Sequence, residues 1–164
     1  MTHPLCYVID FFSYLLRYAS LENHDELLHE VIICLGNFTV QNEENQLFIQ
    51  SGRPPSLLQQ LCTLPFKYFS DQKLKNILFP TVICICYKNT ENMRIVAQDV
   101  NPTLLAIYIE DLMKVDPSSA PVVIDDMDQR SMLDLRFPRA AWDEAKVFFT
   151  EPDTTNVAES TSDE

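Results

Sequence analysis

The chain has 164 residues, of which 46% are hydrophobic, and this is enough for one domain with a substantial core. Its net charge of −12 and pI near 4.5 exclude direct binding to a nucleic-acid backbone or an anionic membrane, because both require clustered lysine and arginine. No apolar stretch reaches the roughly 18 residues of a membrane span and no signal peptide is evident, so we expect no membrane insertion by this chain.

Apolar residues recur with helical spacing almost throughout the chain, so we predict an all-α fold. The first predicted helix begins at Pro4 and is apolar on all sides, which predicts burial between neighbouring elements. Pro80 lies inside a later predicted helix, and we expect it to kink or split that helix. The predicted helices cover residues 4–19, 25–40, 43–51, 54–64, 70–87, 91–98, 101–115 and 138–151.

Two stretches depart from this helical pattern. Residues 116–135 contain two prolines and a cluster of aspartates, which predicts a long loop with one weak strand candidate at 122–124. Residues 151–164 hold five acidic and no basic residues, which predicts a disordered acidic tail. We therefore expect one helical domain over residues 1–150, followed by that tail.

The chain also repeats itself at an offset of 47 residues. Two separate blocks align at this one offset, 42–49 with 89–96 and 55–58 with 102–105. A period of this length is typical of helical repeats that stack into a solenoid. The only two glycines, Gly36 and Gly52, flank one short predicted helix, and we interpret this segment as the junction between repeats.

No residue pattern indicates catalysis or a bound metal. Cys84 and Cys86 have one intervening residue, no second ligand pair and different directions on a helix, so we interpret them as core thiols. His24 and His29 are five residues apart, which suits no metal motif. The cysteines number five and lie in apolar runs, which predicts buried, reduced thiols. We therefore expect no enzyme activity and no cofactor.

The segment CLGNFTVQNEENQLFIQSGRPPSLLQQL resembles the junction between consecutive armadillo repeats. Leu35, Asn37 and Phe38 match the end of the third helix in that family. The resemblance implies an armadillo-type helical-repeat solenoid with a C-terminal capping helix, in which third helices line a peptide-binding groove. Ile33 and Cys84 replace two residues that clamp nuclear-import signals, so that specificity is not implied. The apolar first helix predicts that the solenoid is incomplete or unusually exposed.

A closer resemblance rests on three blocks, HEVIICLGNFTVQNEENQLFIQSGRPPSLLQQLCTLPFKYFSD, LFPTVICICY and RFPRAAWDEAKVFF. They resemble the C-terminal region of the S-phase cyclin A-associated endoplasmic reticulum protein family. This implies a non-enzymatic adaptor in the cytoplasm or at the cytosolic face of the endoplasmic reticulum, with the nucleus as an alternative.

The same resemblance implies protein partners that are reached through a longer protein. They are a ribosome-associated tetratricopeptide-repeat factor, which acts in tubulin mRNA autoregulation, and a cyclin A complex. The alternative function is a regulatory scaffold subunit of a kinase or of another enzyme assembly. Neither function requires direct contact between this chain and nucleic acid.

Two surfaces are candidates for binding a partner. The first is the groove lined by third helices, with candidate residues Asn37, Gln41, Tyr87 and Lys88. The second offers cations and aromatic rings of the kind enriched at interfaces, from Arg53, Lys67, Tyr68 and Phe69. The alternative for Tyr68 and Phe69 is packing inside the core between repeats.

Overall fold

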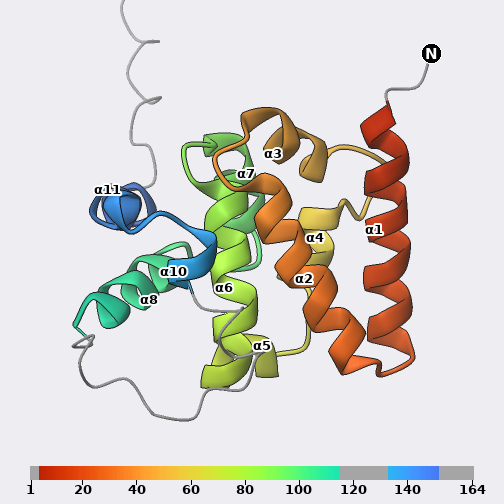
Figure 1. Cartoon of the computed structure of the whole chain (residues 1–164), viewed down its shortest axis with the longest axis horizontal. Coiled ribbons are helices and arrows are strands. Elements are labelled where there is room, and N and C mark those ends of the chain that lie inside the picture. The colour runs from red at the N-terminus through yellow and green to blue at the C-terminus, as the bar shows by residue number, and fades with distance from the viewer. Residues whose placement is uncertain (1–3, 115–132, 152–164) are drawn as a thin grey trace, which may run out of the picture.

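The computed structural model describes residues 4–114 and 133–151, and within these ranges all regular elements are helices (Figure 1). The elements are α1 (Pro4–Leu21), α2 (Asp25–Thr39), α3 (Glu43–Gln50), α4 (Leu57–Cys62), α5 (Lys67–Ser70), α6 (Gln72–Cys86), α7 (Thr90–Val96), α8 (Thr103–Lys114), α10 (Leu133–Arg136), the 3-10 helix η2 (Arg139–Ala141) and α11 (Trp142–Thr150). The prediction of an all-α fold is confirmed. The strand candidate, most of the predicted loop and nearly all of the predicted tail lie outside the described residues.

Side-chain caps fix where several helices begin. Asp71 accepts hydrogen bonds from two backbone N–H groups in the first turn of α6. Before α4, the Ser56 and Gln59 side chains each accept a hydrogen bond from the other residue's N–H, which forms a capping box. The helix that we expected from residue 54 therefore begins at Leu57, after both prolines.

α2 and α6 pack along each other at the centre of the molecule (Figure 1). α1 covers α2 and also contacts α4, while α8 and α11 pack together on the other side of α6. The buried apolar side chains form one cluster that runs through these helices and includes Ile32, Leu58 and Ile83, all with no exposed area. Burial of each such side chain contributes about 1.5–3 kcal/mol, so this cluster is the main source of stability.

The helix ends that the 47-residue offset aligns share one backbone geometry. α2 ends at Thr39 and α6 ends at Cys86, and the second residue after each helix has a positive φ. These residues are Gln41, with φ 49°, and Lys88, with φ 62°. Asn23, the second residue after α1, also has a positive φ of 54°, so all three turns share this backbone geometry.

The asparagines of the repeat make the same hydrogen bonds in both copies. Asn42 accepts a hydrogen bond from the N–H of Asn45 at the start of α3, and Asn89 accepts one from Asn92 at the start of α7. Asn45 and Asn92 each donate through the side-chain amide to a carbonyl seven residues earlier, at 2.6 and 3.0 Å. The asparagines therefore fix the angle between each long helix and the short helix that follows it.

Pro80 does not split α6, which continues through it as one helix. Proline has no N–H, so the carbonyl of Asn76 cannot receive the usual bond from the residue four positions later. The Arg136 guanidinium, at the end of α10, instead donates to the carbonyls of Asn76 at 2.9 Å and Ile77 at 3.0 Å. α6 is therefore not split at Pro80, a kink there stays a prediction, and a distant side chain satisfies the carbonyl that Pro80 leaves without its helical partner.

Gly36 lies where α2 and α6 approach each other closely. A Cβ atom at this position would lie 2.9 Å from Thr81 Oγ1 and 3.3 Å from both Arg136 Nη1 and Thr81 Cα. The Thr81 hydroxyl donates to the carbonyl of Ile32 at 2.7 Å and accepts from Arg136 at 2.6 Å. The absence of a side chain at Gly36 thus makes room for a buried hydrogen-bonded chain that joins α2, α6 and α10.

α1 is not buried on all sides. Its buried side chains, Ile9, Leu16 and Ala19, face the rest of the molecule, while several large apolar side chains on its other face are exposed. The expectation of burial between neighbours was therefore wrong for this face of α1.

The cysteines divide into a buried and a more accessible set. Cys62, Cys84 and Cys86 are buried, as predicted for core thiols, and burial raises the pKa of Cys62 and of Cys84 to about 12. Cys34 is exposed and Cys6 is partly buried. The expectation that all five thiols are buried was therefore wrong for Cys34, which lies on the outer side of α2.

Stability should fall with decreasing pH in a manner that depends on His29. Its Nε2 atom shares a hydrogen bond of 3.0 Å with the Tyr68 hydroxyl, and burial lowers its pKa below the usual 6.5. Between that lowered pKa and about 6.5 the unfolded chain binds more protons than the native chain, so the free energy of unfolding decreases as pH falls. We expect the melting temperature to drop from about pH 7.5 to about pH 5.5, and to drop less in His29→Gln.

His24→Gln is the matched control, because His24 is exposed, and it should keep the wild-type decrease in melting temperature. The glutamine amide at position 29 does not titrate and can still form a hydrogen bond with Tyr68. An equal pH dependence in the wild type and in His29→Gln would contradict the assignment.

Candidate functional site

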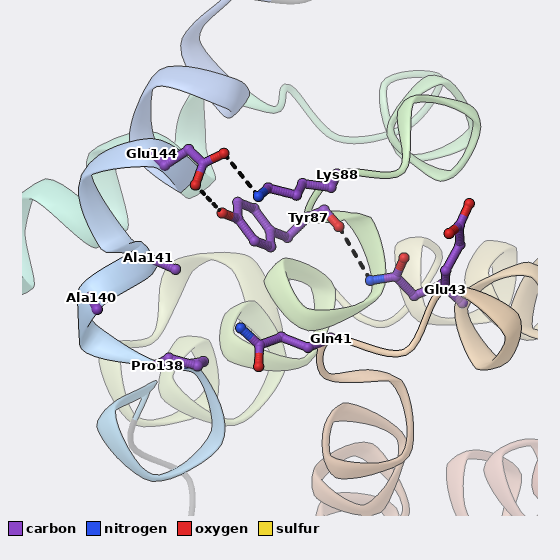
Figure 2. Close-up of a pocket in the computed structure, with 9 residues that line it drawn as sticks. Gln41, Glu43, Tyr87, Lys88, Pro138, Ala140, Ala141 and Glu144 are labelled. Atoms are coloured by element: carbon purple, nitrogen blue, oxygen red, sulfur yellow. Dashed lines mark hydrogen bonds and ion pairs between the residues drawn. The ribbon is translucent and has the colours of Figure 1, made fainter.

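A pocket of about 500 Å³ lies where the C-terminal ends of α2 and α6 meet the start of α11 (Figure 2). Its lining comes from segments far apart in the sequence: Gln41, Glu43, Gln46, Tyr87, Lys88, Pro138, Ala140, Ala141 and Glu144. Gln41 and Lys88 are the two positive-φ residues that follow α2 and α6. The pocket therefore forms where the two repeated turns approach α11.

Tyr87, Lys88 and Glu144 form a hydrogen-bonded group on one wall of the pocket (Figure 2). The Tyr87 hydroxyl donates to Glu144 Oε2 at 2.7 Å, and Lys88 Nζ lies 3.0 Å from Glu144 Oε1. The bonds from Tyr87 and Lys88 lower the pKa of the Glu144 carboxyl, and the bond to Glu144 raises the pKa of Lys88. At neutral pH both groups are therefore charged, and together they connect α11 to the end of α6.

Gln46 joins α3 to the C-terminal end of α6 from inside the fold. Its side chain is only 4% exposed, and its Nε2 atom donates to the carbonyls of Cys84 at 2.8 Å and Tyr87 at 3.2 Å. Carbonyls in the last turn of a helix have no partner within that helix, so Gln46 of α3 satisfies the end of α6. This places α3 and the end of α6 at a fixed separation on one side of the pocket.

The lining combines an apolar wall with polar groups that can form hydrogen bonds. Pro138, Ala140 and Ala141 provide the apolar wall, and the Gln41 amide extends toward it from the opposite side (Figure 2). An amide side chain offers one acceptor and two donor hydrogens, which is the combination that a peptide backbone requires. Glu43 has no ion-pair partner among the described residues, so it adds negative charge to the rim.

Three of the four predicted groove residues meet in this pocket. Gln41, Tyr87 and Lys88 line it, and the 47-residue offset is the sequence signal that relates Gln41 to Lys88. Asn37 is exposed on α2 but is not part of the lining. Sequence reasoning missed Glu144 and the Pro138–Ala141 wall, which come from the RFPRAAWDEAKVFF block and had no local sign of a binding role.

The second predicted surface is brought together only in part. Arg53 and Lys67 are exposed, and Lys67 pairs with Asp25 at 3.3 Å. Tyr68, however, has no exposed area and packs edge-on against the His29 ring, while Phe69 is partly buried. The alternative interpretation of Tyr68, packing in the core, is the one that the structure shows.

An exposed aromatic ring does lie on this surface, but at a different position. Phe66 directly precedes Lys67 and is 79% exposed, and sequence reasoning missed it. It comes just before the four-residue helix α5, which is too short to reveal its buried side through apolar spacing. The cationic and aromatic character expected of this surface is therefore present at Phe66 and Lys67, not at Tyr68.

In the part of the chain that the structure describes, there is no cluster of three or more side chains that could bind a metal ion. In the same residues, no helix has the length and apolarity needed to cross a bilayer.

No protein-family model matches the chain. A comparison with curated proteins finds similarity to the human protein named S phase cyclin A-associated protein in the endoplasmic reticulum. The two sequences are 43% identical over 143 residues, and the match covers 84% of this chain. The chain spans about a tenth of that protein's length, since the match covers 10% of it.

Proposed function

Since the chain is homologous to one part of the S phase cyclin A-associated protein in the endoplasmic reticulum, we propose that it is a non-enzymatic protein-interaction module that acts as an adaptor. The pocket beside Gln41 and Lys88 is its binding site for a segment of a partner protein. The observation that carries this proposal is that a pocket with an apolar wall and hydrogen-bonding groups forms where the two repeat junctions meet.

The fold that we propose for this module is an armadillo-type solenoid in which α11 caps the C-terminal end. The shared geometry of the α2–α3 and α6–α7 junctions supports a repeat of this kind. In such an arrangement α2 and α6 are the third helices of consecutive units. The pocket then lies at the end of the groove that third helices line.

Charge narrows the kind of segment that would bind. Glu43 and Glu144 are acidic and Lys88 is basic, so the charged side chains of the lining sum to −1, within a chain of net charge −12. A partner segment with lysine or arginine beside a small apolar residue would complement both the rim and the alanine wall. In the cell, we propose that this site works at the cytosolic face of the endoplasmic reticulum, within an assembly that contains cyclin A.

A pair of matched variants tests the site. Ala140→Arg places a large side chain in the pocket, and Ala97→Arg makes the same change at an exposed position outside it. Each full chain would be used as bait in cell lysate, with circular dichroism to confirm folding. Any protein retained by the wild type, together with purified cyclin A, would then be titrated by calorimetry. We expect Ala140→Arg to weaken binding at least about tenfold and Ala97→Arg to leave it unchanged.

The same titration compares the pocket with the second surface. Arg53→Glu with Lys67→Glu reverses two exposed charges that are not part of the lining. If this double variant loses the partner while Ala140→Arg retains it, the binding site lies on the second surface and the proposed pocket is wrong. Equal binding by all four proteins would exclude both surfaces.

A further inference from the structure

One face of α1 carries a regular stripe of exposed apolar side chains. Its members lie four, three, four and three residues apart, which is the heptad spacing that forms a continuous seam along one side of a helix. They are Tyr7, Phe11, Tyr14, Tyr18 and Leu21, with exposed fractions of 67%, 59%, 63%, 41% and 72%. We refer to these five residues as the α1 stripe.

The α1 stripe faces away from the rest of the molecule. α1 lies at the edge of the fold, with α2 and α4 packed against its other face (Figure 1). The stripe runs from Tyr7 to Leu21, so at a rise of about 1.5 Å per residue the seam is about 21 Å long. In the described part of the chain no element packs on this seam. Scattered exposed apolar residues are normal, but five in heptad register form a surface suited to another helix.

The charged residues of α1 indicate what that other helix is. They are Asp10 and Arg17, both exposed, and among the described residues neither has an ion-pair partner. They lie seven residues apart, so they occupy the same flank of the stripe but are two turns from each other. Their midpoint lies between Ser13 and Tyr14, near the centre of the stripe. A two-fold axis close to this point would bring Asp10 of each helix near Arg17 of the other.

We propose that two copies of the chain associate through their α1 helices in antiparallel orientation. Helices related by a two-fold axis present the same flank to each other, so both copies contribute one Asp10–Arg17 pair. With the axis between Phe12 and Ser13, Phe11 packs against Tyr14 of the second copy and Tyr7 against Tyr18, and Asp10 lies within about 3 Å of Arg17 along the helix axis. A parallel pair would instead place Asp10 and Arg17 of the two copies on opposite sides of the seam, where neither meets a charge of the other copy. The positions of the charges and of the apolar stripe therefore both favour the antiparallel pair.

The test measures self-association of the full chain by sedimentation equilibrium from about 1 µM to about 200 µM. Tyr14→Glu places a charge at the centre of the seam, and Ile107→Glu is the matched control at an exposed position on α8. We expect the wild type and Ile107→Glu to form dimers. Tyr14→Glu should raise the dimer dissociation constant at least about tenfold, because it buries an unpaired charge.

A charge exchange tests the orientation independently. Asp10→Arg alone should weaken the dimer several-fold, because two arginines then face each other across both flanks. Asp10→Arg combined with Arg17→Asp should restore it, since the pair is re-formed in the opposite sense. Failure of the double variant to recover would overturn the antiparallel arrangement.

Three other results would overturn the proposal as a whole. One is a monomer throughout the concentration range, which would leave the α1 stripe to a different protein. Another is a dimer that Tyr14→Glu does not weaken. The third is a dimer that Ile107→Glu weakens as much as Tyr14→Glu does, which would place the contact on α8. Circular dichroism of each variant separates loss of association from loss of folding.

Discussion

Replacing Arg136 with methionine should lower the free energy of unfolding by about 2–4 kcal/mol. The guanidinium is 4% exposed and donates to the Thr81 hydroxyl and to the carbonyls of Asn76 and Ile77. Methionine fills similar volume but leaves buried carbonyls without their donor. Relief of the buried charge offsets part of that cost, since burial already lowers the pKa of Arg136 to about 10.

Urea unfolding measures this change in the free energy of unfolding. Two further variants serve as a control and as a test of its cause. Arg139→Met is the control, because Arg139 is exposed and its pair with Asp134 spans 3.5 Å, so we expect a loss within about 1 kcal/mol. Pro80→Ala restores an N–H that can reach the Asn76 carbonyl. Arg136→Met should therefore cost less in the Pro80→Ala background than in the wild type. Simple additivity of the two changes would show that Arg136 does not compensate for Pro80.

Replacing Gly36 with alanine should destabilise the protein by about 1–3 kcal/mol, although alanine is the better helix former. The added Cβ would lie 2.9 Å from Thr81 Oγ1, and that oxygen is held by hydrogen bonds on both sides. The neighbouring Cα of Thr81, at 3.3 Å, cannot move without shifting α6 against α2. The measurement is again the free energy of unfolding in urea.

Gly52→Ala separates this packing effect from the general effect of replacing glycine. No atom lies within 4 Å of a Cβ at Gly52, but its φ of +97° is unfavourable for alanine. We expect Gly52→Ala to lower the free energy of unfolding by about 1 kcal/mol, and no second substitution in the core should reduce this loss. Thr81→Ala, in contrast, should cost less in the Gly36→Ala background than alone, because it removes the closest contact. Equal costs in both backgrounds would rule out the steric explanation.

Much of the helical framework could be predicted from apolar spacing and capping residues. The observed bounds of α2, α3 and α6 differ from the predicted bounds by no more than two residues. Polar capping residues at their starts, and Gly52 after α3, indicated where these helices begin and end. The 47-residue offset also relates the turns after α2 and α6, which have the same backbone geometry in the structure. Apolar spacing could not predict which face of α1 packs against the other helices, because all of its faces are apolar.

The contacts that define the site depend on residues with no local pattern. Gln41 and Lys88 could be related through the repeat, but Glu144 and Gln46 reach the pocket only through tertiary packing. The role of Arg136 could not be predicted for the same reason, because it depends on Pro80, 56 residues earlier in the sequence. When a side chain donates to an unpaired carbonyl in another helix, the sequence around that side chain gives no indication of it.

The bond from Arg136 to the Asn76 carbonyl also has a consequence for biosynthesis. The two residues are 60 positions apart, and ribosomes add about 5–20 residues per second, so Arg136 is made about 3–12 s after Asn76. During that interval α6 can pack on α2 while the carbonyl beside Pro80 still lacks its donor. That carbonyl therefore has only water as a donor until α10 has been synthesised.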